Sequence, residues 1–375
     1  MSVLWVLAKV AGGLGFGMIW AAFLGWVERK QSAVMQDRIG ANRADILGFK
    51  AIGLFHIIAD PIKLFTKEDF VPQGVRKAFH AVAPSISLGF PLLALAAFPY
   101  GGTVEFLGRP WSLQPVESPM GLVLVLGMVA VGIHGVVMAG YASNSYYGLL
   151  GGLRGASQMI AYEACLAATM AGAVFLFGTL DLAEAVAWQA RMIGGVLPAW
   201  GIVLQPLGFV LFLIAGAALT KRTPFDLPEG ESEIVGYHVE YSGMKFGMFM
   251  MTDLIESVVV ASLATTLFLG GWHVPFLTAP GVSGAGVALP PFMGSALPAG
   301  LHGPILAALM LGSFTAKVAL VLFVLMQIRW TLPRFRFDQL LDLGWKNILP
   351  LALANFLVTA WAIYLAKAWG IHIWG

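Results

Sequence analysis

Eight long apolar stretches run through the 375-residue chain and constrain its fold more than any other feature. A helix that spans a lipid bilayer needs about 20 predominantly apolar residues. The composition agrees, because 58% of the residues are hydrophobic and only 11% are charged, whereas a soluble domain carries about 25% charged residues. The sequence therefore predicts eight transmembrane helices, at residues 3–27, 79–99, 119–141, 157–179, 201–220, 246–272, 304–329 and 347–367.

The expected fold is an all-α polytopic membrane protein, with residues 1–375 as a single membrane domain. No stretch shows the ten-residue alternation of an outer-membrane barrel. The first stretch lacks a basic leader and an Ala-x-Ala cleavage site, which favours a retained helix over a signal peptide. An additional amphipathic helix is expected at 47–65, where His56, Asp60 and Lys63 share one face. Such a helix either lies on the lipid headgroups or turns its polar face toward a cavity or a partner.

The lysines and arginines are distributed unevenly between the two sides that eight alternating spans define. Seventeen fall on one side and about four on the other, and basic residues concentrate on the cytoplasmic side of membrane proteins. We therefore expect loops 28–78, 221–245 and 330–346 in the cytoplasm. The Gly/Pro-rich segment 273–303 and both termini are expected in the periplasm of a bacterial inner membrane.

The charge and cysteine content exclude several kinds of site. A net charge of +2 without a basic tail argues against nucleic-acid binding. Cys165 is the only cysteine, whereas an iron–sulfur cluster typically takes four, and no dinucleotide fingerprint is evident. We expect no metal, cofactor or catalytic redox group in this chain. Any electron transfer would then occur in partner subunits.

Charged residues inside the apolar stretches are the strongest physical sign of function. Glu163 lies within the fourth stretch, Asp253 and Glu256 are three residues apart in the sixth, and Lys317 lies midway along the seventh. Each is unfavourable in a bilayer unless it is paired or hydrated. The structural alternative is pairing, for instance of Lys317 with a carboxylate. A lone His134 in the third stretch is more typical of a hydrogen-bonded structural histidine.

The loop at 221–245 combines acidic residues with apolar ones. An acidic loop is usually solvated, but this one also contains aromatic and branched residues, which indicates carboxylates that are partly buried and have raised pKa values. Together with the intramembrane charges, it describes a proton route. A transporter, a pump subunit and a quinone site all remain open at this point. The acidic residues of the loop are Asp226, Glu229, Glu231, Glu233 and Glu240.

Eight short motifs, in order along nearly the whole chain, give this sequence a close resemblance to one family. They are ERK at 28–30, RIGANR at 38–43, ADPIKLFTKED at 59–69, ASNS at 142–145, QMIAYE at 158–163, RTPFDLPE at 222–229, EYSGMKF at 240–246 and LPRFRFDQL at 332–340. The sequence resembles the H subunit of proton-pumping NADH:quinone oxidoreductase, respiratory complex I. It departs from the usual pattern at Ala41, where the family usually has proline, and at Asp253, where glutamate is more usual.

The resemblance implies a membrane subunit that forms the quinone chamber with peripheral-arm subunits and couples quinone reduction to proton translocation. Quinone would be the substrate, and FMN and the iron–sulfur clusters would belong to partner subunits. Other membrane-arm subunits and lipid would be further partners. By matching motif, the quinone chamber would be lined by Glu28, Arg29, Arg38, Arg43, Asp60 and Lys63. Proton coupling would fall to Glu163, Asp226, Glu229, Glu231, Glu233 and Asp253.

Two other classes of function use similar features. The related membrane subunit of a hydrogenase or ferredoxin-linked complex tends to lack the KLFTKED and PFDLPEGESE strings, both of which are present here. An ion-coupled transporter is expected to show internal repeats with broken helices in paired positions, and we find no convincing repeat. A purely structural anchor would leave the intramembrane charges unexplained.

Overall fold

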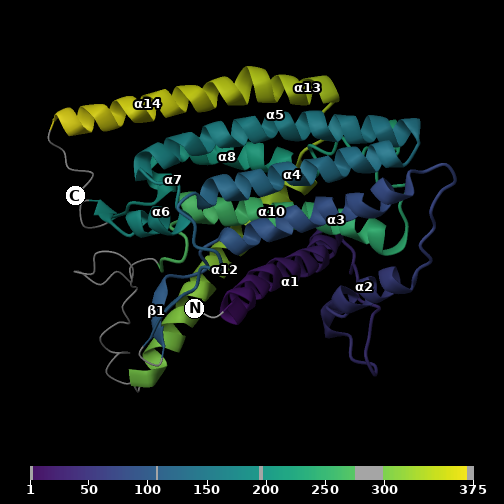
Figure 1. The fold of residues 1–375 in the computed structure, drawn as a ribbon, viewed down its shortest axis with the longest axis horizontal. Coiled ribbons are helices and arrows are strands. Elements are labelled where there is room, and N and C mark those ends of the chain that lie inside the picture. The colour runs from purple at the N-terminus through teal and green to yellow at the C-terminus, as the bar shows by residue number, and fades with distance from the viewer. Residues whose placement is uncertain (1–2, 107–108, 194–196, 275–298, 370–375) are drawn as a thin grey trace.

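The computed structural model describes residues 3–106, 109–193, 197–274 and 299–369, and helices dominate these residues (Figure 1). The helices are α1 (Val3–Met35), α2 (His56–Thr66), α3 (Lys77–Ala94), α4 (Gly121–Ala142), α5 (Tyr146–Phe177), α6 (Leu182–Gln189), α7 (Gly201–Leu204), α8 (Pro206–Leu219), α9 (Glu231–Ile234), α10 (Gly243–Phe268), α12 (Ala299–Thr331), α13 (Phe337–Asp342) and α14 (Leu349–Ala368). Two antiparallel pairs of short strands join β1 (Thr103–Phe106) to β2 (Arg109–Ser112) and β3 (Met192–Ile193) to β4 (Leu197–Pro198).

Seven helices of the described residues are long and apolar enough to cross a membrane, which confirms an all-α polytopic membrane protein. The stretch expected at 201–220 differs from a regular span. It is divided into α7 and the 14-residue α8, with Gln205 between them. Pro206 begins α8, where the missing N–H of proline is tolerated, but it cannot continue the hydrogen bonds of α7. The fifth expected span is therefore a short apolar helix packed against α5.

Several helices extend beyond the apolar stretches that predicted them. α1 continues to Met35, so Glu28 and Arg29 lie on its last turns. α5 begins at Tyr146, and a continuous run of α13, a π-helical segment (Leu343–Ile348) and α14 begins at Phe337. Hydropathy marks where side chains leave the apolar layer, whereas the helical backbone satisfies its own hydrogen bonds on either side of that boundary.

The amphipathic helix is shorter than expected. α2 begins at His56 instead of residue 47, because Leu47, Gly48, Ala51 and Ile52 all have positive φ values. A right-handed helix cannot pass through residues in that conformation. Residues 46–49 form a tight turn and Ala51–Gly53 a single 3-10 turn, and His56, Asp60 and Lys63 share the α-helix that remains.

α10 is the centre of the bundle and packs against α3, α12, α1 and α8. Every residue from Thr252 to Phe268 is buried. Close helix packing elsewhere depends on small residues: a Cβ at Gly135 of α4 would lie 2.5 Å from the backbone nitrogen of Ser87 in α3. α14 lies along the outer side of α5 and is mostly exposed in the isolated chain (Figure 1). Charges on α10 are thus placed in the part of the protein that is most remote from solvent and lipid.

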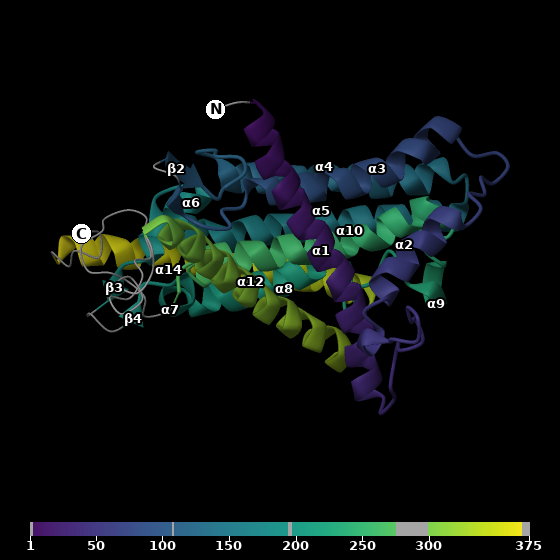
Figure 2. The same cartoon turned by 90° about the horizontal axis from the view of Figure 1, so that it is seen from below.

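The two ends of the bundle differ. α2 and α9 lie at one end, and α6, α7 and the short strands lie at the other (Figures 1 and 2). α14 ends on the side of the strands (Figure 1). Trp5 near the start of α1 contacts Trp111 of β2, with 4.2 Å between ring centroids. The segments richest in basic residues therefore gather at the end away from the beginning of α1 and the end of α14.

Lys317 has a different partner from the carboxylate considered above. Its Nζ donates to the backbone carbonyls of Gly271, at 2.9 Å, and His273, at 2.6 Å, and lies 4.5 Å from the ring centroid of Trp200. The structural alternative, a carboxylate pair, is not found among the described residues, because the segment after α10 presents carbonyl oxygens beside α12. Two carbonyl acceptors and an aromatic face stabilise the ammonium in this position.

We predict that His273 makes the stability of the protein depend on pH. Burial, with a smaller contribution from Lys317, lowers the pKa of His273 to about 4, against about 6.5 in an unfolded chain. Between these values the unfolded state binds a proton that the folded state does not. Stability should therefore fall as pH drops through this window, by about 2 kcal/mol at pH 5.

Thermal unfolding at pH 7.5 and pH 5 in detergent would test this prediction. His273→Gln cannot titrate but keeps a donor for the Val186 carbonyl, which His273 Nε2 contacts at 3.0 Å. Its unfolding temperature should decrease less between the two pH values than that of the wild type. An equal decrease in both proteins would contradict the assignment.

Candidate functional site

A lysine and two carboxylates form a fully buried ionic cluster beside α10. Lys221 Nζ lies 3.1 Å from Asp253 Oδ1 and 3.3 Å from Glu256 Oε2. The three side chains are 1%, 5% and 1% exposed. Asp253 and Glu256 are three residues apart on α10, so their carboxylates lie on the same helical face. Lys221 reaches them from the turn after α8, where it has a φ of 53°.

Glu229 adds a group that can bind a proton. Burial, together with the negative charges of Asp253 and Asp226, raises the pKa of Glu229 well above its usual value. Burial by itself would lower the pKa of Lys221, because it disfavours the charged form. The negative charges of Glu256 and Asp253 together outweigh this effect, so the pKa of Lys221 is raised. Lys221 therefore remains an ammonium ion, whereas Glu229 favours its neutral form.

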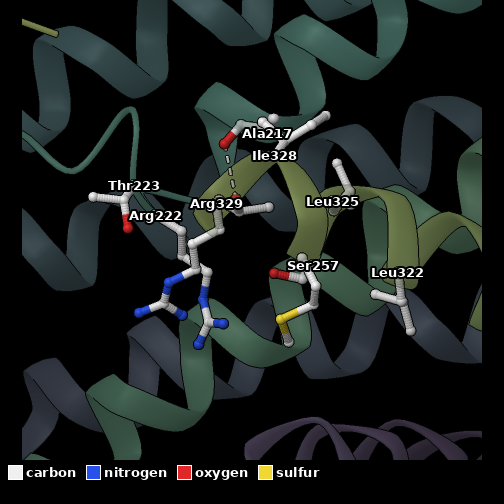
Figure 3. Close-up of a pocket in the computed structure, with 10 residues that line it drawn as sticks. Ala217, Arg222, Thr223, Ser257, Leu322, Leu325, Ile328 and Arg329 are labelled. Carbon is white, nitrogen blue, oxygen red and sulfur yellow. Dashed lines mark hydrogen bonds between the residues drawn. The ribbon is translucent and has the colours of Figure 1, made fainter. Parts of the chain in front are cut away.

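A second cluster joins three helical segments through Glu28 of α1. Glu28 Oε1 accepts a hydrogen bond from Arg222, 3.0 Å away, and also contacts Arg329 of α12. Arg222 directly follows Lys221, so one turn of backbone links the two clusters. Figure 3 shows the two guanidinium groups side by side next to a cavity of about 20 Å³, which Ser257 of α10 also lines.

The charges of the two clusters nearly balance. Three cations face four carboxyl groups, and with Glu229 in its neutral form the numbers are equal. Ions in a low-dielectric interior are tolerated only when they are paired and hydrogen-bonded. We call this set the buried charge network; its members are Glu28, Lys221, Arg222, Glu229, Asp253, Glu256 and Arg329.

The segment between α8 and α9 is held against the bundle by its neighbours. The Phe225 ring stacks on Phe335, with centroids 5.4 Å apart and planes 7° apart. The backbone N–H of Phe335 donates to the Pro224 carbonyl at 3.0 Å. Arg334 donates to the carbonyl of Asp226. The backbone that presents Lys221, Arg222 and Glu229 is therefore fixed by the segment that follows α12.

Comparison with known proteins places the chain in a family. A family model described as NADH dehydrogenase matches residues 8–360. Similar curated proteins include an H subunit of the NADH-quinone oxidoreductase of Geobacter metallireducens, 41% identical over 92% of both chains. The H subunits of Cytophaga hutchinsonii (36% identical over 89% of both chains) and Thermomicrobium roseum (39% over 88% of this chain and 87% of the relative) are also similar. The chain belongs to the H-subunit family of NADH-quinone oxidoreductases.

Membership of the H-subunit family makes this chain an integral membrane component of a multi-subunit oxidoreductase. Among the described residues, no group of three or more His, Cys, Asp or Glu side chains is arranged to hold a metal ion. Cys165 is buried, and its Sγ contacts the Gly344 carbonyl at 3.4 Å.

The six residues that family motifs assign to the quinone chamber are placed in three settings. Arg29 and Asp60 form an ion pair, 2.5 Å apart, between α1 and α2. Glu28 belongs instead to the buried charge network. The remaining three, Arg38, Arg43 and Lys63, are exposed in the isolated chain. Arg38 donates a hydrogen bond to the side chain of Gln36.

Of the residues that family motifs assign to proton coupling, Glu229 and Asp253 belong to the network, and Asp226 lies beside it. The side chain of Glu233 is 39% exposed and forms an ion pair with Arg154, at 2.7 Å. The side chain of Glu231 lies outside the described part of the chain, although its backbone begins α9.

Glu163 occupies a separate place. With His134 it lines an apolar cavity of about 560 Å³ between α3, α4 and α5. No charged partner of Glu163 is found in the part of the chain that the structure describes. The structure therefore separates Glu163 from the ionic contacts of the network.

Four members of the network were not assigned to a site from the sequence. They are Lys221, Arg222, Glu256 and Arg329. A partial signal existed, because Glu256 follows Asp253 by three residues, and two buried carboxylates on one helical face require a cation. Lys221 contributed only to the orientation count, and Arg222 to that count and to a family motif. Their spatial pairing depends on the turn at Lys221, which the residue types do not reveal.

We predict that Lys221→Met strongly destabilises the protein, because it leaves two buried carboxylates without their cation. Breaking a buried pair in this way costs about 3–5 kcal/mol. The variant should reach low levels in the membrane, and adding Glu256→Gln should restore part of them. Lys346→Met is the matched control, since Lys346 forms an exposed pair with Asp342 that contributes about 0.3–0.5 kcal/mol.

Quantitative immunoblots of membranes would provide the measurement. Wild-type levels of Lys221→Met, or a double variant no better than the single one, would contradict the assigned role of the ion pairs.

Proposed function

We propose that this chain forms the quinone-binding chamber together with peripheral-arm subunits and couples quinone reduction to proton translocation. The observation that carries the proposal is the buried charge network, which contains a buried carboxyl group of raised pKa, that of Glu229, near Asp253 of α10. Such perturbed groups gather at functional sites. All three relatives carry the name NADH-quinone oxidoreductase, which supports quinone as the substrate.

The chamber would lie at the end of the bundle where α1 and α2 meet. The Arg29–Asp60 pair connects these helices, and Arg38, Arg43 and Lys63 present cationic groups around them. Peripheral subunits would cover this surface and supply electrons from FMN and iron–sulfur clusters. Glu28, one residue before Arg29, would connect the chamber to the buried network through Arg222.

The coupling follows from the chemistry of the substrate. A quinone takes up two electrons and two protons to become a quinol. In a low-dielectric chamber, added negative charge strongly raises the proton affinity of nearby carboxylates. The ionised carboxylates around Lys221 would respond by taking up a proton, whereas Glu229, which is already protonated, would supply one toward the chamber. Glu163 would relay the change in protonation from the network into the membrane, toward the antiporter-like subunits.

The orientation and location complete the proposal. The end with α2 and α9 would face the cytoplasm and the end with the strands the periplasm, in a bacterial inner membrane, with both termini in the periplasm. The basic residues of loops 28–78, 221–245 and 330–346 support this arrangement. The segment 273–303 would be periplasmic; most of it lies outside the described residues.

We predict that Glu163→Gln assembles normally but loses most coupled activity. The amide keeps the size of the side chain and is easier to bury than a carboxylate, but it cannot exchange a proton. Quinone reductase turnover and proton pumping should both fall by about ten-fold or more, in the range of lost acid–base groups. The measurement is quinone-dependent turnover per assembled complex in membranes.

Glu184→Gln is a suitable control for Glu163→Gln. Glu184 is an exposed glutamate on α6 that accepts a hydrogen bond from the Thr179 hydroxyl at 2.6 Å. Its replacement should leave turnover unchanged. If Glu163→Gln turns over and pumps like the wild type, Glu163 has a structural role only.

Cysteine labelling should establish the orientation. We predict that Leu47→Cys reacts with an impermeant thiol reagent only in inverted vesicles, whereas Thr103→Cys in β1 reacts in intact cells. Both positions are exposed, and Cys165 is buried, so the wild-type background should be low. The opposite pattern would reverse the proposed topology.

A further inference from the structure

Gln158 of α5 is fully buried and makes two short hydrogen bonds to the segment that carries the network. Its Nε2 lies 2.7 Å from the carbonyl oxygen of Ala218 and 2.7 Å from that of Phe225. An amide NH₂ has two hydrogens, so each carbonyl receives one. This assignment also fixes the orientation of the amide, because its oxygen would be repelled by both carbonyls.

The two carbonyls lie on either side of the turn that presents the cations of the network. Ala218 is near the end of α8, and Phe225 follows the turn; Lys221 and Arg222 lie between them. Lys221 has a left-handed backbone conformation, which is unfavourable for a residue with a Cβ. A clamp across the turn therefore stabilises the conformation that directs Lys221 toward α10 and Arg222 toward Glu28.

We propose that Gln158 is a positioning residue, which closes the 218–225 turn and thereby sets the geometry of the buried charge network. It acts through the turn and touches no ion of the network. Gln158 also lies five residues before Glu163 on the same helix, so a displacement of α5 at Glu163 would reach Lys221 and Arg222 through one side chain. The inference rests on the proposed function and extends it to this link.

The contact requires a side chain of the length of glutamine that donates two hydrogen bonds. Methionine has a similar length but no donor. Asparagine is shorter by one methylene and cannot span both carbonyls. Glutamate as a carboxylate is repelled by the two oxygens, whereas its neutral acid donates one hydrogen bond.

The test uses the assembled complex with Gln158→Met and Gln158→Glu. Turnover per complex should fall by about 10-fold to 100-fold in Gln158→Met, as expected for misplaced groups, and the pH dependence of turnover should shift. Gln158→Glu should recover activity as pH falls, because protonation restores one donor. This comparison within one variant remains informative even if Gln158→Met assembles poorly.

Gln189→Met is the matched control. Gln189 is also fully buried and donates to two carbonyls, those of Ala185 at 3.1 Å and Thr266 at 2.8 Å, but at the opposite end of the bundle. Its replacement should lower the amount of complex without changing the pH dependence of turnover per complex. If Gln158→Met and Gln158→Glu behave in the same way as this control, Gln158 does not act on turnover through the network, and the link between Gln158 and coupling fails.

A structure of the Gln158→Met complex separates this inference from the proposed function. An undisturbed 218–225 turn, with Lys221 still on Asp253, would overturn the positioning role whatever the role of the network. A displaced turn with unchanged turnover would uphold the positioning role and contradict coupling through the network.

Discussion

The insertion of Lys221 between two carboxylates of α10 is the interaction on which the rest of the structure depends. An ion in the interior of a membrane protein is tolerated only with a counter-ion at close range, and here the distances are 3.1 and 3.3 Å. The requirement fixes the end of α8 against α10. Arg222 follows directly, so the same turn also brings α1 and α12 together through Glu28.

Neutral groups hold a second lysine just beyond the C-terminal end of α10. There Lys317 binds two backbone carbonyls and the face of Trp200 in place of a carboxylate. The carbonyls belong to the segment that follows α10, so the lysine satisfies backbone acceptors that lie outside the helix. α10 is therefore held near its middle by ionic groups and at its C-terminal end by hydrogen bonds from Lys317 to neutral carbonyls. This difference favours proton chemistry near Lys221.

The sequence predicted the class of fold because the length of an apolar stretch is a local property. It predicted poorly which groups the buried charged side chains contact. Apolar stretches located the long helices, and only the one interrupted by Pro206 differs in kind. Glu229 and Asp253 were selected from family motifs. Lys221, in contrast, acquires its role from a left-handed turn that brings it next to Asp253 of α10, which is 32 residues away along the chain. The partners of Lys317 are backbone atoms, which no pattern of side chains reveals.

Redox-triggered infrared difference spectroscopy of the assembled complex tests the central claim most directly, because protonated carboxyl groups absorb apart from carboxylates. The account predicts a carboxyl band that changes when quinone is reduced and that is lost in Glu229→Gln, whereas the exposed Glu184→Gln retains it. A spectrum without any carboxyl change on quinone reduction, or one that Glu229→Gln leaves intact, would contradict a buried charge network that changes its protonation with the redox state of quinone.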